Sequence, residues 1–502
     1  MKICGIAFVL LLGASSLSAL TATSTTISSS LNPSIYGQSV TFTANVSPQP
    51  PNGEIVTFEQ GQSVIGTGGL SGGTATFATS ALTPGNTRNI KAVYKGDSTF
   101  SGSTSSPVGQ LINQATTTTT LSSSQNPVNS GQPVTFTAQV SPQISGPNVT
   151  GNVLFYSGSA HIGTISLSSG VAALTTTTLA SGTDSITAVY KGSSAFITST
   201  SNAINQGVEV GTTTNATMTW DGITRYYMTY VPGVLPANPP MLVMLHATNF
   251  SVPPNYPSML NYGWQPLADL NEFILVQPAS TLNTKSGAWN WNSYFLDPAF
   301  QTNPGPDDSG FLRALIVKLS SKYNVNPNMV YVTGFSSGAQ MAERVGVDIS
   351  DLVAAIAPTS GELVDQEVPP PGLPGPAVAP VSVQEWQGTA DTELPPCNYG
   401  TTVYSGVTFT VDTVDDTFNY WVGQNGCSTL QTAQPLCANS APNNANDAAT
   451  PNMPGMTGNI ATSCNGGSNV EVQFIWEPGT GHSWVTKNNT ARWQFFSAHP
   501  KQ

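Results

Sequence analysis

Two hydrophobic patterns divide the chain near residue 209. Before that point, short runs alternate apolar and polar residues, as in the Val-Thr-Phe-Thr-Ala of residues 40–44, and Gly, Pro and Asn separate the runs. A period of two predicts antiparallel strands with one buried face. After residue 209, continuous apolar runs alternate with segments of helical spacing. That pattern predicts a parallel sheet covered by helices on both faces.

The first pattern occurs twice. Residues 37–48 read GQSVTFTANVSP and residues 131–142 read GQPVTFTAQVSP, and neither half contains a cysteine. A unit of about 95 residues has the size of an immunoglobulin-like sandwich. We therefore expect one repeat over residues 23–114 and a second over residues 115–208. Both resemble the bacterial immunoglobulin-like repeats of cell-surface and secreted proteins.

The fold alone does not define a ligand. Such repeats can therefore be a spacer or a module that binds polysaccharide or another polymer. Their Phe and Tyr residues are scattered through the predicted strands and form no exposed row. This distribution favours the spacer.

The second pattern suits a single α/β-hydrolase domain over residues 209–502. Asp-Gly at residues 221–222 predicts a hairpin turn, and apolar residues at helical spacing predict a helix over residues 311–323. Buried strands are expected at residues 241–245, 273–277, 330–332, 354–357, 381–386 and 470–476. The expected fold is thus multidomain: two all-β immunoglobulin-like sandwiches followed by an α/β-hydrolase domain.

The N-terminus predicts export. Residues 1–22 contain a cation at Lys2, a short apolar core and small residues near Ala19, which together are the parts of a secretory signal peptide. The core is too short for a stable membrane anchor, and no other run approaches about 18 apolar residues. We expect a secreted protein without a transmembrane anchor.

Composition narrows the partners. The net charge is −12 and no Lys/Arg cluster occurs, which argues against nucleic acid. After the signal peptide, an even number of cysteines predicts two disulfides with three possible pairings. Because no Cys-x-x-Cys motif or flanking His accompanies them, no metal site is expected. These cysteines are Cys397, Cys427, Cys437 and Cys464.

A candidate nucleophile lies in the Gly-Phe-Ser-Ser-Gly of residues 334–338, which follows a β-branched strand and precedes a helix. A serine on such a turn has an exposed hydroxyl, and the positive end of the helix faces developing negative charge. This predicts Ser336 as the nucleophile of a serine hydrolase. A second Gly-x-Ser-x-Gly surrounds Ser71, but no helix follows it, so it reads as a hairpin turn.

A serine nucleophile needs a base, usually histidine. His161 lies in the second repeat, His499 is close to the C-terminus, and His246 ends a predicted strand. His482 follows the last strand in a glycine-rich loop, where an α/β-hydrolase places its base. His482 is therefore the predicted base.

The acid is expected between the nucleophile and the base. Asp391 follows the strand at residues 381–386, and Glu393 is its near rival. The chain order Ser336, Asp391, His482 is the order that this fold uses. Other carboxylates lie on what reads as a later helix: Asp412, Asp415 and Asp416.

Two backbone N–H groups should stabilise the oxyanion. One belongs to Ser337, directly after the nucleophile, and the other is expected at Thr248, after the strand at residues 241–245. Three tryptophans either line a substrate cleft or anchor the core. They are Trp289, Trp291 and Trp484.

Residues 224–497 resemble the secreted esterases grouped with polyhydroxybutyrate depolymerases and feruloyl or acetylxylan esterases. The resemblance implies hydrolysis of carboxylic esters with no metal and no organic cofactor. The matching segments are residues 245–246, 288–291, 307–311, 330–338, 387–391, 425–427 and 481–484.

The resemblance also implies which cysteines pair. Two positions depart from the family pattern: Ala247 replaces a glycine after His246, and Ala288 stands where a cysteine often precedes Trp-Asn-Trp. The second departure implies one bridge fewer. The implied pairs are Cys427–Cys464 and Cys397–Cys437.

The expected function is a feruloyl or acetylxylan esterase that acts on plant polysaccharide, so its partner is an ester substrate, possibly polymeric. One alternative is a depolymerase of polyhydroxybutyrate or a similar polyester. An alternative of another class is an adhesion or matrix protein with an inactive hydrolase domain.

Overall fold

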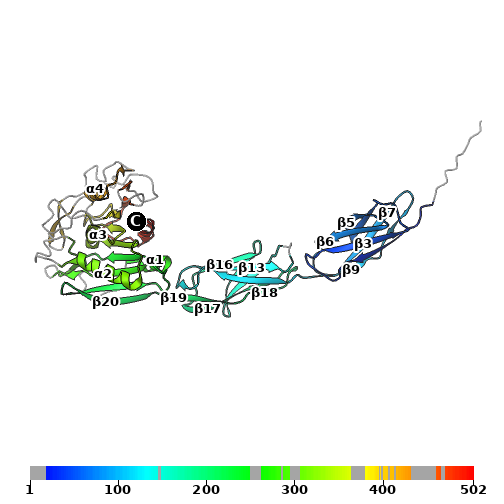
Figure 1. Ribbon diagram of the computed structural model, residues 1–502, viewed down its shortest axis with the longest axis horizontal. Helices are drawn as coiled ribbons and strands as arrows, with labels where there is room; N and C mark the ends of the chain where they lie inside the picture. The colour runs from blue at the N-terminus through cyan, green and yellow to red at the C-terminus, as the bar shows by residue number, and fades with distance from the viewer. Residues whose placement is uncertain are drawn as a thin grey trace, which may run out of the picture. The chain divides into compact units, whose positions relative to one another are not determined.

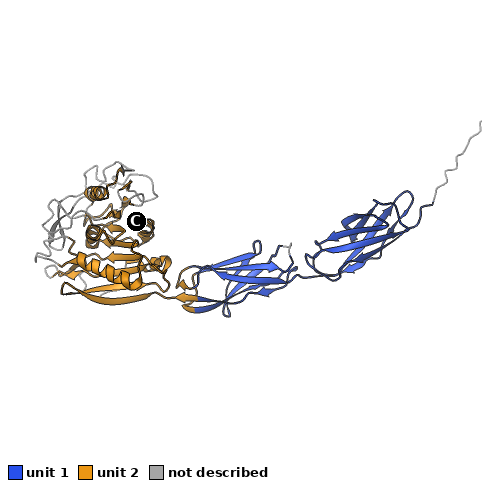
Figure 2. Ribbon diagram, in the orientation of Figure 1, with its two compact units in different colours: residues 1–126, 133–176, 183–206 blue, residues 127–132, 177–182, 207–502 orange. Residues whose placement is uncertain are grey.

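The structure is a computed structural model with two compact units, residues 1–126, 133–176 and 183–206, and residues 127–132, 177–182 and 207–502 (Figure 2). Residues 1–18, which make up most of the expected signal peptide, lie outside the described residues. None of the described helices is long and apolar enough to cross a membrane. The structure describes residues 19–144, 148–248, 262–283, 287–293, 306–362, 379–394, 396, 400–404, 407–411, 414–430, 460–464 and 470–501.

The first repeat consists of two main sheets around an apolar core. Buried and less buried residues alternate along β3, and Val40, Phe42, Ala44 and Val46 face the core. The sheets have the orders β1-β3-β6 and β5-β4-β7-β8, with β9 beside β7, while β2 and β10 form a short parallel pair. The strands are β1 (Ser24–Ser29), β2 (Ser34–Ile35), β3 (Val40–Ser47), β4 (Ile55–Gln60), β5 (Ser63–Gly69), β6 (Thr74–Thr79), β7 (Arg88–Gly96), β8 (Ser101–Thr104), β9 (Val108–Gln110) and β10 (Ile112–Asn113).

The second repeat has a closely similar arrangement. Val134, Phe136, Ala138 and Val140 of β13 are buried at the same alternation. Its sheets have the orders β11-β13-β16 and β12-β19-β17-β14-β15, with β18 beside β17. The strands are β11 (Thr117–Ser123), β12 (Val128–Asn129), β13 (Val134–Pro142), β14 (Asn152–Ser157), β15 (Ala160–Ser166), β16 (Val171–Thr176), β17 (Gly182–Tyr190), β18 (Ser199–Thr200) and β19 (Ile204–Glu209).

The Gly-x-Ser-x-Gly copy around Ser71 lies in a turn between β5 and β6. Ser71 and Thr74 exchange two backbone hydrogen bonds, and Gly72 and Gly73 have φ of 61° and 78°. The prediction of a turn at this position is confirmed.

A ten-stranded sheet forms the core of the second unit, in the order β20-β21-β23-β22-β26-β27-β28-β33-β32-β31. Its edge strand β20 is labelled in Figure 1. The pairs from β23 to β33 are parallel, and antiparallel strands flank them on both sides. The strands are β20 (Thr212–Trp220), β21 (Ile223–Val231), β22 (Met241–Leu245), β23 (Ile274–Pro278), β26 (Val330–Phe335), β27 (Ala355–Thr359), β28 (Ser382–Gly388), β31 (Thr429–Leu430), β32 (Ile460–Thr462) and β33 (Val472–Glu477).

Sequence pattern predicts these elements well. The Asp221-Gly222 turn joins β20 to β21 with positive φ at both residues, as a tight hairpin requires. Each of the six predicted buried strands is present, with ends shifted by up to three residues, and the predicted helix is α2 (Asp308–Tyr323).

Helices cover both faces of this sheet. Met241, Val243 and Leu245 of β22 belong to a cluster that includes residues of α2, α3 (Ser337–Asp348) and α4 (Val414–Gln424). Leu242 and Met244 face the other way, into a cluster with residues of α1 (Gln265–Asn271) and α5 (Asn489–Ala498). Smaller elements are β24 (Thr281–Leu282), β25 (Trp289–Asn290), β29 (Gly400–Tyr404), β30 (Val407–Val411) and a 3-10 turn, η2 (Thr486–Asn488).

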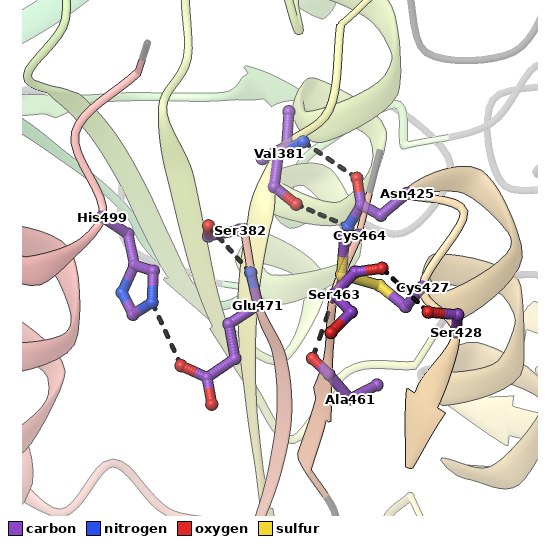
Figure 3. Close-up of a disulfide and its surroundings, with 10 residues drawn as sticks. All are labelled: Val381, Ser382, Asn425, Cys427, Ser428, Ala461, Ser463, Cys464, Glu471 and His499. Carbon is purple, nitrogen blue, oxygen red and sulfur yellow. Dashed lines mark hydrogen bonds and ion pairs between the residues drawn. A yellow bond between two sulfur atoms is a disulfide. The ribbon is translucent and has the colours of Figure 1, made fainter. Parts of the chain in front are cut away.

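A disulfide joins Cys427, just after α4, to Cys464, just after β32 (Figure 3). It is the first of the two pairs that the family resemblance implies. Beside it, the Asn425 side chain accepts a hydrogen bond from the Val381 N–H at 3.0 Å and donates to the Val381 carbonyl at 2.8 Å. The second implied pair, Cys397–Cys437, lies outside the described residues.

Candidate active site

Ser336 occupies a strained turn between β26 and α3. Its φ of 55° and ψ of −122° are unusual for a residue with a side chain. A Cβ on Gly334 would lie 2.0 Å from the Gly338 carbonyl oxygen, and a Cβ on Gly361 would lie 2.5 Å from that of Ser336. Glycine at these positions therefore permits the sharp reversal that exposes the serine hydroxyl.

The start of α3 packs against the end of β22. A Cβ on Gly338 would meet the carbonyl oxygens of Leu245 and His246 at 2.3 and 2.6 Å, so a larger residue would push the two elements apart. This close approach places Ser337, the first residue of α3, beside the loop that follows β22. The motif glycines thus shape the turn and also bring the two expected oxyanion segments together.

Thr248 lies in that loop, and its hydroxyl donates to Asn290 Oδ1 at 2.9 Å. The neighbouring Ala247 N–H donates to the Tyr262 hydroxyl at 3.1 Å. These two hydrogen bonds tie the loop to β25 and to the segment before α1.

Ser336, His482 and Asp391 are brought together from three loops. His482 Nε2 lies 2.9 Å from Ser336 Oγ, and His482 Nδ1 lies 2.8 Å from Asp391 Oδ2. A carboxylate only accepts hydrogen bonds, so Nδ1 carries the proton and Nε2 is left to accept from the serine hydroxyl. This is the hydrogen-bonded chain that a nucleophile, a base and an orienting acid require.

Backbone groups fix the Asp391 carboxylate. Its Oδ1 accepts from the N–H groups of Glu393 and Leu394, both at 2.9 Å, and the residue is buried. Because the loop supplies these donors itself, Oδ2 is directed at the imidazole. Of the rival carboxylates, Glu393 Oε2 is 3.9 Å from His482 Nε2, Asp415 and Asp416 lie on α4, and Asp412 lies outside the described residues.

His246 has a different role from His482. Its Nε2 accepts from the Ser280 N–H at 3.0 Å, so Nδ1 carries the proton and donates to the Ala247 carbonyl at 2.6 Å. Burial lowers the pKa of His246 to about 4. A neutral ring with both nitrogens engaged holds the loop after β22 in place and has no nitrogen free to act as the base.

The remaining histidines lie apart from these groups. His161 Nε2 is 2.9 Å from the Thr164 hydroxyl in the second repeat. His499 Nε2 is 3.1 Å from Glu471 Oε2 (Figure 3).

Arg492 is a supporting residue that sequence reasoning missed. Its guanidinium lies 4.4 Å from the Trp386 ring centroid and 4.2 Å from that of Trp484, and it is 3.3 Å from Glu477 Oε1. Burial lowers the pKa of Arg492 to about 10, and Glu477 opposes that shift. Since Trp386 precedes the Asp391 loop and Trp484 follows His482, Arg492 fixes the segments that carry both residues.

Sequence reasoning also missed a buried ion pair that fixes the segment around Trp289 and Trp291. Arg225 Nη2 lies 2.5 Å from Asp308 Oδ1, and Asp308 Oδ2 accepts from the Asn292 N–H at 2.7 Å. Burial raises the pKa of Asp308, and Arg225 opposes that shift. The signal was the Asp-Asp of residues 307–308 among the family-like segments, but its partner lies 83 residues away.

The three tryptophans differ in exposure. Trp291 is fully buried in the core and donates to the His246 carbonyl at 2.8 Å. This burial favours the core anchor over a lining of the cleft, because the ring has no surface for a substrate. Trp289 and Trp484 are partly exposed, and Trp484 packs with Phe335, whose ring centroid is 4.9 Å from that of His482.

Both halves of the chain are similar to known proteins. Residues 20–113 and 121–209 match the bacterial Ig-like domain (group 3). Feruloyl esterase B of Piromyces equi is 29% identical over 186 residues, which cover 36% of this chain and 31% of the relative. Acetylxylan esterase A of Aspergillus awamori is 33% identical over 135 residues, 26% of this chain and 40% of the relative.

A third relative, poly(3-hydroxyalkanoate) depolymerase C of Paucimonas lemoignei, is 28% identical over 133 residues, 26% of this chain and 30% of the relative. These relatives are carboxylic ester hydrolases. The chain spans less than half the length of each of them. Among solved structures, acetyl xylan esterase from Aspergillus awamori matches with a TM-score of 0.39 and 19% identity, over 57% of this chain and 100% of that one.

Proposed function

We propose that residues 209–502 form an α/β-hydrolase domain and that this chain is a secreted serine esterase. The observation that carries the proposal is the hydrogen-bonded sequence Ser336–His482–Asp391 at the carboxyl ends of β26, β33 and β28. The chain order of the three residues and the parallel strands between β23 and β33 both support this fold.

In the first half-reaction, Ser336 Oγ attacks the ester carbonyl carbon while His482 Nε2 takes its proton. Asp391 accepts from Nδ1 and stabilises the imidazolium. When the tetrahedral intermediate collapses, the alcohol oxygen leaves with the proton from Nε2. Water then attacks the acyl-serine with the same base, and the acid and free Ser336 are regenerated.

The oxyanion forms on the carbonyl oxygen, where we place the N–H groups of Ser337 and Thr248. The Ser337 N–H is at the positive end of α3. In the facing loop, the Ala247 N–H already donates to Tyr262, which supports Thr248 as the second donor. One such donor is worth about 10²–10³ in turnover. These residues supply every group that the reaction needs.

The proposed substrate is a feruloyl or acetyl ester of plant polysaccharide, since two of the relatives are named a feruloyl esterase and an acetylxylan esterase. The poly(3-hydroxyalkanoate) depolymerase among the relatives makes polyester the second candidate. In either case, we propose that the immunoglobulin-like repeats are a spacer and that Trp289 and Trp484 contact the substrate.

The test is covalent labelling by a fluorophosphonate together with hydrolysis of a panel that contains acetylated xylan, feruloylated xylan and a poly(3-hydroxybutyrate) emulsion. Ser336→Ala should abolish labelling, whereas Ser71→Ala, in the other Gly-x-Ser-x-Gly, should label normally. Release of acetate or ferulate supports the polysaccharide esterase, and clearing of the emulsion alone supports the depolymerase. An unlabelled wild-type chain would indicate an inactive hydrolase domain.

A further inference from the structure

Glu393 places a second carboxylate beside the reacting atoms. Its Oε2 lies 3.9 Å from His482 Nε2, and its side chain is 49% exposed. Asp391 contacts the opposite ring nitrogen and is buried. The two carboxylates therefore face the imidazole from different sides, and only the Glu393 carboxylate is open to solvent and to a substrate.

Hydrogen bonds to Asp391 fix the backbone at Glu393. Its backbone N–H donates to Asp391 Oδ1, as does that of the buried Leu394. Within the described part of the chain, the His482 imidazole is the only basic group within 4.0 Å of the Glu393 carboxylate. Neither Lys nor Arg in that part of the chain neutralises this carboxylate, which is free to accept hydrogen bonds from a ligand.

The reaction defines what occupies the space next to Glu393. His482 Nε2 gives its proton to the departing alcohol oxygen, so that oxygen must come within about 2.6–3.2 Å of Nε2. Glu393 Oε2 and the departing oxygen are thus neighbours of the same nitrogen. A carboxylate in this place accepts only from a donor, and the nearest donor on an alcohol is a hydroxyl on the adjoining carbon.

We propose that Glu393 is a specificity residue that accepts a hydrogen bond from a hydroxyl adjacent to the ester on the alcohol side of the substrate. A sugar esterified at a secondary ring position carries such a hydroxyl, whereas the alcohol part of a poly(3-hydroxyalkanoate) carries none beside its ester oxygen. The inference rests on the proposed esterase function and deepens it by naming a vicinal diol or sugar as the preferred leaving group.

Two matched esters test this proposal in the full chain: the monoacetate of trans-1,2-cyclohexanediol and cyclohexyl acetate, which differ by one vicinal hydroxyl. The measured quantity is kcat/KM for the hydroxylated ester divided by kcat/KM for cyclohexyl acetate. Glu393→Ala should lower the ratio about tenfold or more, because hydrogen bonds to charged groups are the stronger kind. Glu393→Gln keeps an acceptor oxygen but not the charge, so its ratio should fall less. Thr392→Ala, a neighbouring exposed position, is the matched control and should not change the ratio.

The outcomes separate this proposal from the esterase function. A ratio that stays the same in Glu393→Ala overturns the specificity role. If the ratio is unchanged because activity falls equally on both esters, Glu393 acts instead in the support of His482. If wild-type protein is labelled by the fluorophosphonate but shows no preference for the hydroxylated ester, only the leaving-group proposal fails. If it is neither labelled nor active, the proposed function itself fails.

Discussion

The immunoglobulin-like repeats and the sheet unit bury different kinds of residue. In the described part of the repeats, the buried polar side chains are uncharged, such as Gln110 and Gln206. Gln110 donates to the Leu31 carbonyl at 2.9 Å and Gln206 donates to that of Gln125 at 3.0 Å. Each glutamine side chain thus links two distant segments of its own repeat.

Every charged residue buried in the described chain lies after residue 209, and the set includes Arg225, Asp308, Glu343, Glu385 and Arg492. Burying charge is costly unless it is paired. In the sheet unit, Arg225–Asp308 and Arg492–Glu477 are ion pairs that hold segments of the candidate site. Glu343 and Glu385 are instead buried carboxyl groups with raised pKa values.

The largest expected effect concerns the nucleophile. Ser336→Ala should reduce turnover by roughly 10⁶-fold, by comparison with other serine hydrolases, because it removes the proposed attacking oxygen. The stability of neither region should fall, because alanine differs from serine only by the loss of one hydroxyl and can adopt the same backbone. Steady-state kinetics and calorimetry measure the two quantities. A variant with a tenth of wild-type activity would show that Ser336 is not the nucleophile.

Next in size is the comparison of a buried ion pair with a partly exposed one. Arg492→Met should destabilise the sheet unit by about 3–5 kcal/mol, because Glu477 then stays buried without its cation. The control in the first repeat is Lys91→Met, at the more exposed Lys91–Glu59 pair of 3.1 Å, which should cost about 1 kcal/mol or less. Urea unfolding measures both, and equal losses would remove the contrast between the regions.

The disulfide belongs to the sheet unit alone, because the repeats contain no cysteine. Replacing Cys427 and Cys464 together by serine should lower the stability of this unit by about 2–4 kcal/mol, since the open chain gains conformational freedom. The calorimetric transitions of the repeats should stay in place. A shift of the repeat transitions would contradict independent folding.

A pH effect should also separate the regions. Burial raises the pKa of Glu343 to about 8, against a hydrogen bond from Trp421. Burial, followed by the carboxylates of Glu343 and Glu362, raises the pKa of Glu385. Raised folded-state values favour the protonated form, so this contribution to stability is complete below about pH 4.5 and is lost as pH rises towards 8.

Between pH 6 and 8, we therefore expect the sheet unit to lose stability, because both carboxyl groups hold their protons more tightly in the folded protein than in the unfolded chain. Glu343→Gln should flatten that loss while it keeps an acceptor for Trp421. His246 acts in the opposite sense, because its depressed pKa of about 4 removes stability as pH falls from 6.5. Urea titrations at pH 6, 7 and 8 measure the slope, and the same slope in wild type and variant would contradict the assignment.

Sequence alone determined much of this protein. The period-two runs gave both repeats, the Asp221-Gly222 turn gave a hairpin, and the strand–glycine–serine–helix pattern located Ser336. It also named Asp391 and His482, which the structure brings within hydrogen-bonding distance. These features are readable because each depends on a local period or on the fixed order of loops along one sheet.

Tertiary structure alone decided the rest. It placed Trp291 in the core, paired Arg225 with Asp308, set Arg492 between two tryptophans and turned Glu393 towards His482. Arg492 also donates to Thr359, 133 residues away. No local pattern encodes such partners, because a buried polar group is satisfied by whichever side chain the folded backbone brings to it.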